Sequence, residues 1–237
     1  MHQREKYAII CANSPQKNRL ESMRVDLPIS GKKTSRCGEN AASSADFNEN
    51  RGNFMPKIAL TGSIACGKSL FSSLLRSLGV EILDADDVAH ELIPPEERAR
   101  LAKIVFKDSA KRKELETKLH PLIKKRLDDW QEAELARGKI AIVIIPLLYE
   151  VGWEGAYDII GAIVCDRSLQ IKRMIETRGY SQEQAEARLA AQINAEEKAS
   201  RADYAIWNNG TKEELEKSAG AFLAWLKQRI SEIQTNI

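Results

Sequence analysis

Short apolar runs alternate with longer stretches of helical periodicity from Met55 to the end of the chain. The apolar runs cover residues 57–61, 80–83, 140–145, 159–165 and 204–207. The helical stretches cover residues 68–78, 95–137, 168–178, 181–200 and 211–233. Continuously apolar strands are typical of a sheet that is buried on both faces. The alternation therefore predicts an α/β protein with a parallel central sheet covered by helices on both sides.

Two local signals refine the predicted helices. Pro121 disfavours helical backbone at His120, so we expect the stretch 95–137 to break there. Thr211 and Glu214 have the spacing of a capping box, in which each side chain bonds the backbone N–H of the other. We therefore expect the closing helix to begin at Thr211.

Residues 1–54 differ from the rest of the chain. Positions 31–53 are rich in Ser, Asn, Gly, Lys and Glu and have almost no periodic apolar signal, which predicts disorder. Two interpretations stay open: a real flexible extension, or a misread start site with Met55 as the true first residue. Neither gives this segment a catalytic role, so the predicted domain covers residues 55–237.

Composition excludes several classes of function. The chain has 237 residues and a net charge of +2, which does not favour nucleic acid as the main partner. No apolar run approaches the roughly 18 residues that span a bilayer. The cysteines are far apart, which indicates reduced thiols and a cytoplasmic protein; they are Cys11, Cys37, Cys66 and Cys165.

The strongest motif follows the first predicted strand and opens the first predicted helix. Residues 62–69 read GSIACGKS, which fits the phosphate-binding pattern G-x-x-x-x-G-K-[ST] in full. Its glycines, Gly62 and Gly67, let the backbone wrap around phosphate oxygens. Lys68 is expected to reach the β- and γ-phosphates, and the Ser69 hydroxyl to bind Mg²⁺. The amides expected to point at the phosphates are those of Ala65, Cys66, Gly67, Lys68, Ser69 and Leu70.

Carboxylates follow the second predicted strand. Asp84 and Asp86 stand at its carboxyl end, the end at which parallel sheets bind ligands. A carboxylate there orients or deprotonates an attacking hydroxyl. The alternative is that one of them caps the next helix. The two roles can be divided between the two residues.

The chain resembles bacterial dephospho-CoA kinase from Lys57 to about Leu226. The segments that carry the resemblance are ALTGSIACGKS, LDADDVAHEL, KLHPLI, PLLYE and RGYSQEQAEARLAAQINAEEKASRADYAIWNNG. The resemblance implies a P-loop NTPase three-layer sandwich with a small helical acceptor domain at about 87–137 and a helical lid at about 168–200. It also implies ATP-dependent phosphorylation, with Mg²⁺, of the ribose 3′-hydroxyl of dephospho-CoA. We expect a monomer or a weak homo-oligomer.

The resemblance also implies roles for single residues. Asp86 would be the catalytic base, and His90 and His120 would belong to the acceptor site. Three arginines would belong to the lid region and would neutralise charge on the transferring phosphoryl group: Arg173, Arg178 and Arg188. Among them, Arg178 would be catalytic and Arg188 would bind the substrate. Asn208 and Gly210 would lie near the adenine.

Each of these residues also has a simpler interpretation. The histidines fit structural positions, and the arginines fit a solvated helical face. Asn208, Asn209 and Gly210 form a good turn signal by themselves. Tyr149 and Trp153, which follow the third strand, fit either an acceptor pocket or ordinary packing.

Three departures from the family pattern bear on function. Leu70 replaces a threonine, and Ile144 replaces an aspartate that is expected to support Mg²⁺. The stretch between Glu91 and Arg98 is much shorter than usual. Two alternatives to a dephospho-CoA kinase follow: a P-loop kinase of another nucleoside or nucleotide, and a nucleotide-binding protein without transfer activity.

Overall fold

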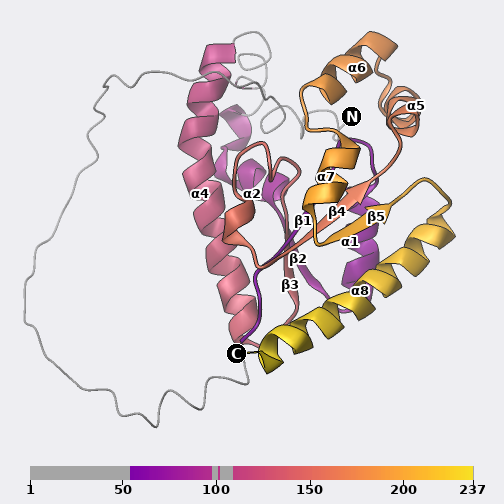
Figure 1. The fold of residues 1–237 in the computed structure, drawn as a ribbon. Helices are drawn as coiled ribbons and strands as arrows, with labels where there is room; N and C mark the ends of the chain where they lie inside the picture. The colour runs from indigo at the N-terminus through magenta and orange to yellow at the C-terminus, as the bar shows by residue number, and fades with distance from the viewer. Residues whose placement is uncertain (1–53, 98–100, 102–108, 237) are drawn as a thin grey trace, which may run out of the picture.

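The computed structural model describes residues 54–97, 101 and 109–236, and Figure 1 shows their arrangement. Within these residues a five-stranded parallel sheet has the order β2-β3-β1-β4-β5. The strands are β1 (Ile58–Thr61), β2 (Glu81–Asp84), β3 (Ala141–Ile144), β4 (Ile159–Val164) and β5 (Tyr204–Trp207). The predicted parallel sheet is confirmed, and each strand lies within one residue of its predicted start and end.

Helices cover both faces of this sheet, as the buried strands required. The described helices are α1 (Lys68–Ser77), α2 (Ala85–Leu92), α4 (Ser109–Ala136), the short 3-10 helix η1 (Glu154–Ala156), α5 (Arg167–Arg178), α6 (Gln182–Ala190), α7 (Ala195–Arg201) and α8 (Lys212–Thr235). In Figure 1, α1 and α8 lie on one side of the sheet and α2 and α4 on the other, with α5 and α6 at one end. The fold is a three-layer α/β sandwich.

The side chains of β1 alternate between the two faces of the sheet, so this strand contributes to both apolar clusters. Ile58 and Leu60 belong to the apolar cluster beneath α1 and α8, whereas Ala59 between them belongs to the cluster beneath α2 and α4. Successive side chains of a strand point to opposite faces, so an unbroken apolar run fills both. The phosphate-binding motif thus begins at the end of a fully buried strand, which is a rigid support.

Helix α4 passes through Pro121 without a break, so the predicted break was wrong. An interior proline removes a helical hydrogen bond and destabilises a helix by about 3 kcal/mol. Here Leu119, Ile123 and Leu127 on the same helix are buried in the cluster beneath α2 and α4. Their packing holds the helix on both sides of the proline, so tertiary contacts outweigh the local preference. The rest of the predicted stretch 95–137 lies partly outside the described residues.

The predicted helix 181–200 was also wrong in extent, because it is two helices. Helix α6 ends at Ala190 and α7 begins at Ala195. The Asn194 side chain caps α7 by accepting a hydrogen bond from the Glu197 N–H at 2.7 Å. Asn194 with Glu197 has a capping spacing that the sequence displays. By contrast, the capping box of Thr211 and Glu214 is confirmed at the start of α8.

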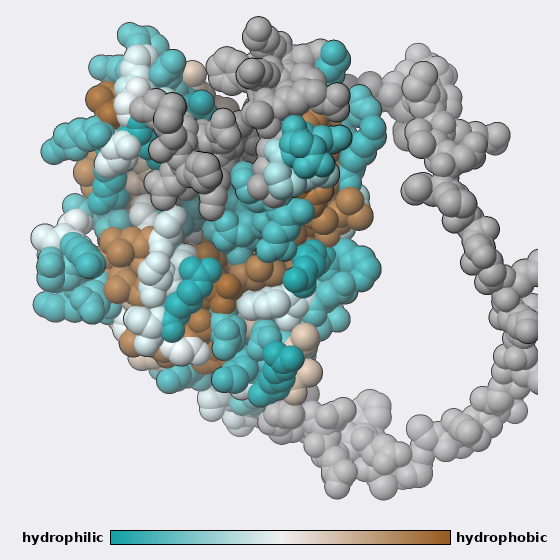
Figure 2. Space-filling model, turned by 180° about the vertical axis from the view of Figure 1, so that it is seen from behind, coloured by the Kyte–Doolittle hydropathy of each residue, from teal (hydrophilic) through white to brown (hydrophobic). Residues whose placement is uncertain are grey.

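The rear face in Figure 2 shows apolar atoms in a broken band among hydrophilic ones. None of the helices in the described part of the chain is long and apolar enough to cross a membrane. The predictions for residues 1–53, including Cys11 and Cys37, lie outside the described residues, as does part of the shortened stretch after Glu91.

Candidate active site around the phosphate loop

The phosphate loop, residues 62–69, connects β1 to α1 at the carboxyl end of the sheet. Its backbone visits positive φ three times, at Gly62 (154°), Ala65 (61°) and Gly67 (94°). Gly67 is the N-cap of α1, and no side chain makes a capping hydrogen bond there. Free N–H groups and the helix dipole make this terminus suited to an anion. The motif therefore has the local structure that its sequence predicted.

Two close approaches explain why glycine stands at both ends of the loop. A Cβ on Gly62 would lie 2.1 Å from the Ile163 carbonyl oxygen, and one on Gly67 would lie 2.3 Å from the Asn208 Nδ2. A Cβ at Gly62 would collide with backbone, and one at Gly67 would require the Asn208 amide to shift. Strand β4 and the segment after β5 thus press directly against the loop.

We expect Gly67→Ala to weaken ADP binding by about tenfold while the protein stays folded. An L-residue in the left-handed region costs roughly 1–2 kcal/mol, and each 1.4 kcal/mol is tenfold in affinity. Calorimetric titration with ADP measures the effect. Gly79→Ala is the matched control, since Gly79 also has positive φ (85°) but nothing lies within 4 Å of its Cβ position. An unchanged affinity in Gly67→Ala would contradict the assigned role of this glycine.

Lys68, the first residue of α1, folds back over the loop. Its Nζ donates to the carbonyl oxygens of Gly62 at 2.6 Å and Ser63 at 2.9 Å. These neutral acceptors hold the ammonium beside the cradle, where a phosphate oxygen would replace them as a stronger, charged partner. Cys66 is buried, and its Sγ donates to the Ser63 carbonyl at 2.7 Å, so this thiol braces the turn.

Of the two carboxylates after β2, Asp84 takes the capping role that one of the interpretations allowed. The Asp84 side chain caps α2 by accepting from the Asp86 N–H at 2.9 Å. Burial raises the pKa of Asp84, and Lys68 and Arg76 lie close enough to oppose that shift. Asp86 lies in the first turn of α2 and has no capping duty there. The catalytic role of Asp86 stays a prediction.

The segment after β5 closes the loop from the other side. Asn208 is buried, and its Nδ2 donates to the Cys66 carbonyl at 2.9 Å. Arg173 on α5 donates to the carbonyl oxygens of Asn208 at 3.1 Å and Ala65 at 3.4 Å. The structure thus places Asn208 against the phosphate loop, and its expected position near the adenine stays a prediction. Gly210 lies before α8, where a Cβ would collide with the Glu214 carboxylate.

Two glutamines that the sequence analysis did not single out also hold the loop. Gln170 on α5 donates through Nε2 to the Ile64 carbonyl at 2.9 Å. The Oε1 of Gln192, in the segment after α6, accepts from the Ile64 N–H at 3.0 Å. Gln170 is one of the two buried residues of α5, with Met174, but no spacing rule marks it as functional.

The comparisons with known proteins agree with this geometry. Residues 57–99 and 96–214 match the family profile described as dephospho-CoA kinase. A dephospho-CoA kinase of Geobacillus kaustophilus is 36% identical over 194 residues, 72% of this chain and 95% of the relative. One of Geobacter sulfurreducens is 38% identical over 184 residues, 68% of this chain and 93% of the relative. The chain belongs to the dephospho-CoA kinase family.

Solved structures give the same family likeness. The crystal structure of TT1252 from Thermus thermophilus has a TM-score of 0.59 and 34% identity, covering 71% of this chain and 96% of that one. A dephospho-CoA kinase from Campylobacter jejuni has a TM-score of 0.53 and 28% identity, covering 72% of this chain and 96% of that one. The predicted fold class, a P-loop kinase sandwich, is confirmed.

Within this dephospho-CoA kinase family fold, Ile144 lies at the carboxyl end of β3, in register with Asp84 on one side and Leu60 on the other. It is fully buried in the cluster beneath α1 and α8. The position of the expected family aspartate is therefore filled by core packing. The described residues contain no group of three or more His, Cys, Asp or Glu side chains arranged to hold a metal ion.

The remaining predicted residues lie on the helical parts of the family fold. His120 on α4 packs edge-on against Trp153, with ring centroids 5.5 Å apart, and burial lowers its pKa. His90 lies near the end of α2. Arg178 is the last residue of α5, and Arg188 on α6 stacks over the Tyr180 ring at 4.5 Å. The contact of His120 with Trp153 fits its structural interpretation, and the functional roles of all four residues stay predictions.

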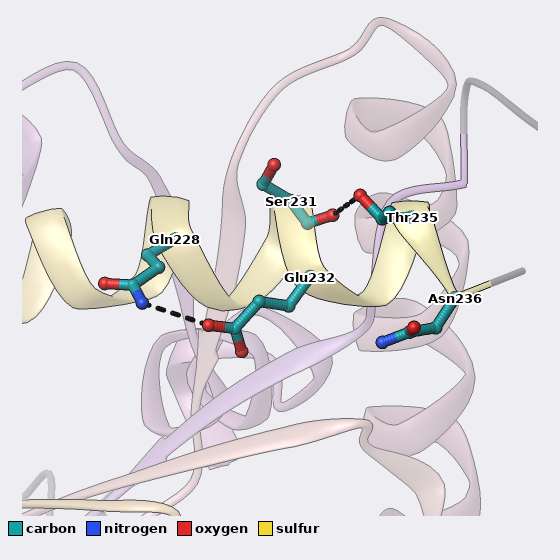
Figure 3. A pocket seen from close by; sticks show the side chains of 5 residues that line it. All are labelled: Gln228, Ser231, Glu232, Thr235 and Asn236. Atoms are coloured by element: carbon teal, nitrogen blue, oxygen red, sulfur yellow. Dashed lines mark hydrogen bonds between the residues drawn. The ribbon is translucent and has the colours of Figure 1, made fainter.

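A shallow hollow elsewhere in the family fold is not the nucleotide site. Figure 3 shows its lining, which comes entirely from the last turns of α8 and the residue after it: Gln228, Ser231, Glu232, Thr235 and Asn236. Gln234 in the same turns donates to the Phe54 carbonyl at 2.9 Å. Phe54 precedes β1, so this hollow lies at the opposite end of that strand from the phosphate loop.

Proposed function

We propose that this chain transfers the γ-phosphoryl group of ATP to the 3′-hydroxyl of the ribose of dephospho-CoA, giving coenzyme A and ADP. The observation that carries the proposal is a complete phosphate loop on β1, with Asp86 at the same carboxyl edge of the sheet, in a member of the dephospho-CoA kinase family. The donor site and a candidate base therefore meet at one edge.

Each step of the reaction has a residue to support it. The amides of residues 65–70 hold the phosphates, and the Lys68 ammonium turns from its carbonyl partners to the β- and γ-oxygens. Asp86 orients the attacking hydroxyl and accepts its proton. Arg178, at the end of α5, supplies positive charge to the transferring group, which carries the developing charge of a loose transition state.

We also propose Mg²⁺ as the cofactor. The Ser69 hydroxyl stands on the first turn of α1, and Mg²⁺ prefers a few protein oxygens together with phosphates and water, so this donor fits. The ion would neutralise charge between the β- and γ-oxygens. His90, His120 and Arg188 are proposed contacts of the acceptor, and Asn208 and Gly210 of the adenine. A cytoplasmic monomer or weak homo-oligomer stays the predicted setting.

The purified full-length chain should form coenzyme A from ATP, Mg²⁺ and dephospho-CoA. ADP release is followed continuously, and the product is identified by mass. Reactions without dephospho-CoA, and with adenosine or AMP in its place, are the controls. ADP released equally without dephospho-CoA would mean hydrolysis and would sink the proposal.

One observation favours a second candidate, a nucleotide-binding protein without transfer activity. Ile144 places a fully buried apolar side chain where the family pattern has a carboxylate. The same assay separates the two: tight ADP binding with no product from any acceptor would support the second candidate. Product from an acceptor other than dephospho-CoA would instead indicate a kinase of another nucleoside or nucleotide.

A further inference from the structure

A fully buried ion pair lies beside the phosphate loop and has no part in the proposed chemistry. The Nζ of Lys198 on α7 lies 2.8 Å from the Oε1 of Glu150, and the two side chains are 0% and 1% exposed. The same ammonium donates to the Pro146 carbonyl at 2.8 Å. Burial lowers the pKa of Lys198, and Glu150 opposes that shift. A buried pair is stabilised by further hydrogen bonds; here the Lys198 ammonium has one to Pro146, whereas the second oxygen of Glu150, Oε2, is buried without a hydrogen-bond partner among the described residues.

Hydrogen bonds connect this ion pair to the phosphate loop by two routes, one through Pro146 and one through Ile193. The Pro146 carbonyl also accepts from the Thr61 hydroxyl at 3.2 Å, and Thr61 is the last residue of β1 before the loop. Glu150 Oε1 also accepts from the Ile193 N–H at 3.0 Å. The preceding residue, Gln192, accepts from the Ile64 N–H. The return segment, residues 191–194 between α6 and α7, is therefore fixed to the loop and to the ion pair.

We propose that Gln192, Glu150 and Lys198 are positioning residues that hold the phosphate loop in its nucleotide-binding conformation. Together they form a clamp that joins the return segment of the predicted lid to Thr61 and Ile64, on either side of Gly62. This inference rests on the proposed function, because it assigns the clamp to the ATP side of that reaction. The clamp does not touch phosphate, so its effect passes through the loop backbone.

Stability alone does not account for the clamp. Apolar packing already attaches α7 to the sheet, since Ala195 is buried against Ala162 and Val164 of β4. Replacing a buried ion pair by apolar side chains is often neutral for stability. The hydrogen bonds of the charged pair hold the carbonyl of Pro146 and the N–H of Ile193 in defined orientations. Pro146 and Ile193 are the residues through which the pair is connected to the phosphate loop.

The first test is Gln192→Met, which removes the acceptor for Ile64 N–H and leaves the buried pair intact. The second is the double variant Glu150→Gln with Lys198→Met, which removes both charges together. In each, we expect the KM for ATP and the dissociation constant of ADP to rise about tenfold, while the KM for dephospho-CoA changes by less than about twofold. A merely structural loss would lower kcat through the active fraction and leave both KM values unchanged.

Hydrogen–deuterium exchange supplies a readout that needs no acceptor. Amides of the peptide covering residues 61–70 should exchange about tenfold faster in both variants, and those of α8 at the same rate as before. Arg201→Met is the matched control. Arg201 also lies on α7 and contacts Glu154 at 2.6 Å, Glu197 and the Tyr149 ring, none of which belongs to the phosphate loop.

The outcomes are separable. Unchanged ADP affinity and exchange in Gln192→Met would overturn the clamp, and that variant decides alone if the double variant does not fold. An equal effect in Arg201→Met would also overturn it, because the change would then reflect loosening of α7 in general. A wild-type chain that makes no coenzyme A would defeat the proposed function, whereas ADP affinity and exchange would still test the clamp.

Discussion

Lys68→Met is expected to lower kcat by about 10²- to 10³-fold, the cost of removing one preorganised donor from a site where charge develops. The Lys68 ammonium is held over the loop by the Gly62 and Ser63 carbonyls, so it waits beside the phosphate position. Methionine keeps the length of the side chain and removes its charge. Steady-state kinetics with ATP and dephospho-CoA measure the loss, and circular dichroism verifies the fold.

Lys57→Met is the control for the general loss of a lysine. Lys57 stands before the amino end of β1, at the opposite end of the strand from the loop, and pairs with Glu132 on α4 at 2.8 Å. Such a partly exposed pair contributes about 0–1 kcal/mol to stability, so kcat should stay within about twofold of the wild type. A Lys68→Met protein with normal kcat would remove this residue from the mechanism.

Sequence patterns predicted the phosphate loop and its setting because both depend on local rules. Buried parallel strands leave unbroken apolar runs, and a loop that wraps phosphate needs glycine at fixed positions. The Thr211 capping box was predicted for the same reason, since its bonds join residues three apart. Asp84 shows the limit of such rules. Only the structure shows that Asp84, not Asp86, caps α2.

Features set by distant contacts were not predictable. The continuity of α4 through Pro121 depends on side chains that pack against a sheet formed by other parts of the chain. The roles of Gln192 and Lys198 depend on bonds to residues far away in the sequence, Ile64 and Pro146. A buried lysine looks like any other lysine until its partner is known. Ile144 was flagged by the family pattern, but its full burial needed the structure.

Asp86→Asn is expected to lower kcat by about 10²- to 10⁴-fold, the range that a positioned general base contributes. The Asp86 backbone is fixed by its bond to the Asp84 side chain, and an amide of the same shape can keep that geometry. Asparagine still orients a hydroxyl but does not accept its proton. ADP affinity, measured by calorimetry, should therefore stay within about twofold, because the phosphate loop is untouched.

Asp87→Asn is the matched control for Asp86→Asn, since Asp87 is the next residue on the first turn of α2 and is exposed. Its kcat should be close to the wild type. The pattern of kinetic change in Asp86→Asn then decides the role of the carboxylate. A fall in kcat with normal KM for dephospho-CoA identifies a base, whereas a higher KM with normal kcat identifies a binding group. Normal values of both would mean that the hydroxyl attacks without a protein base, which a loose transition state permits.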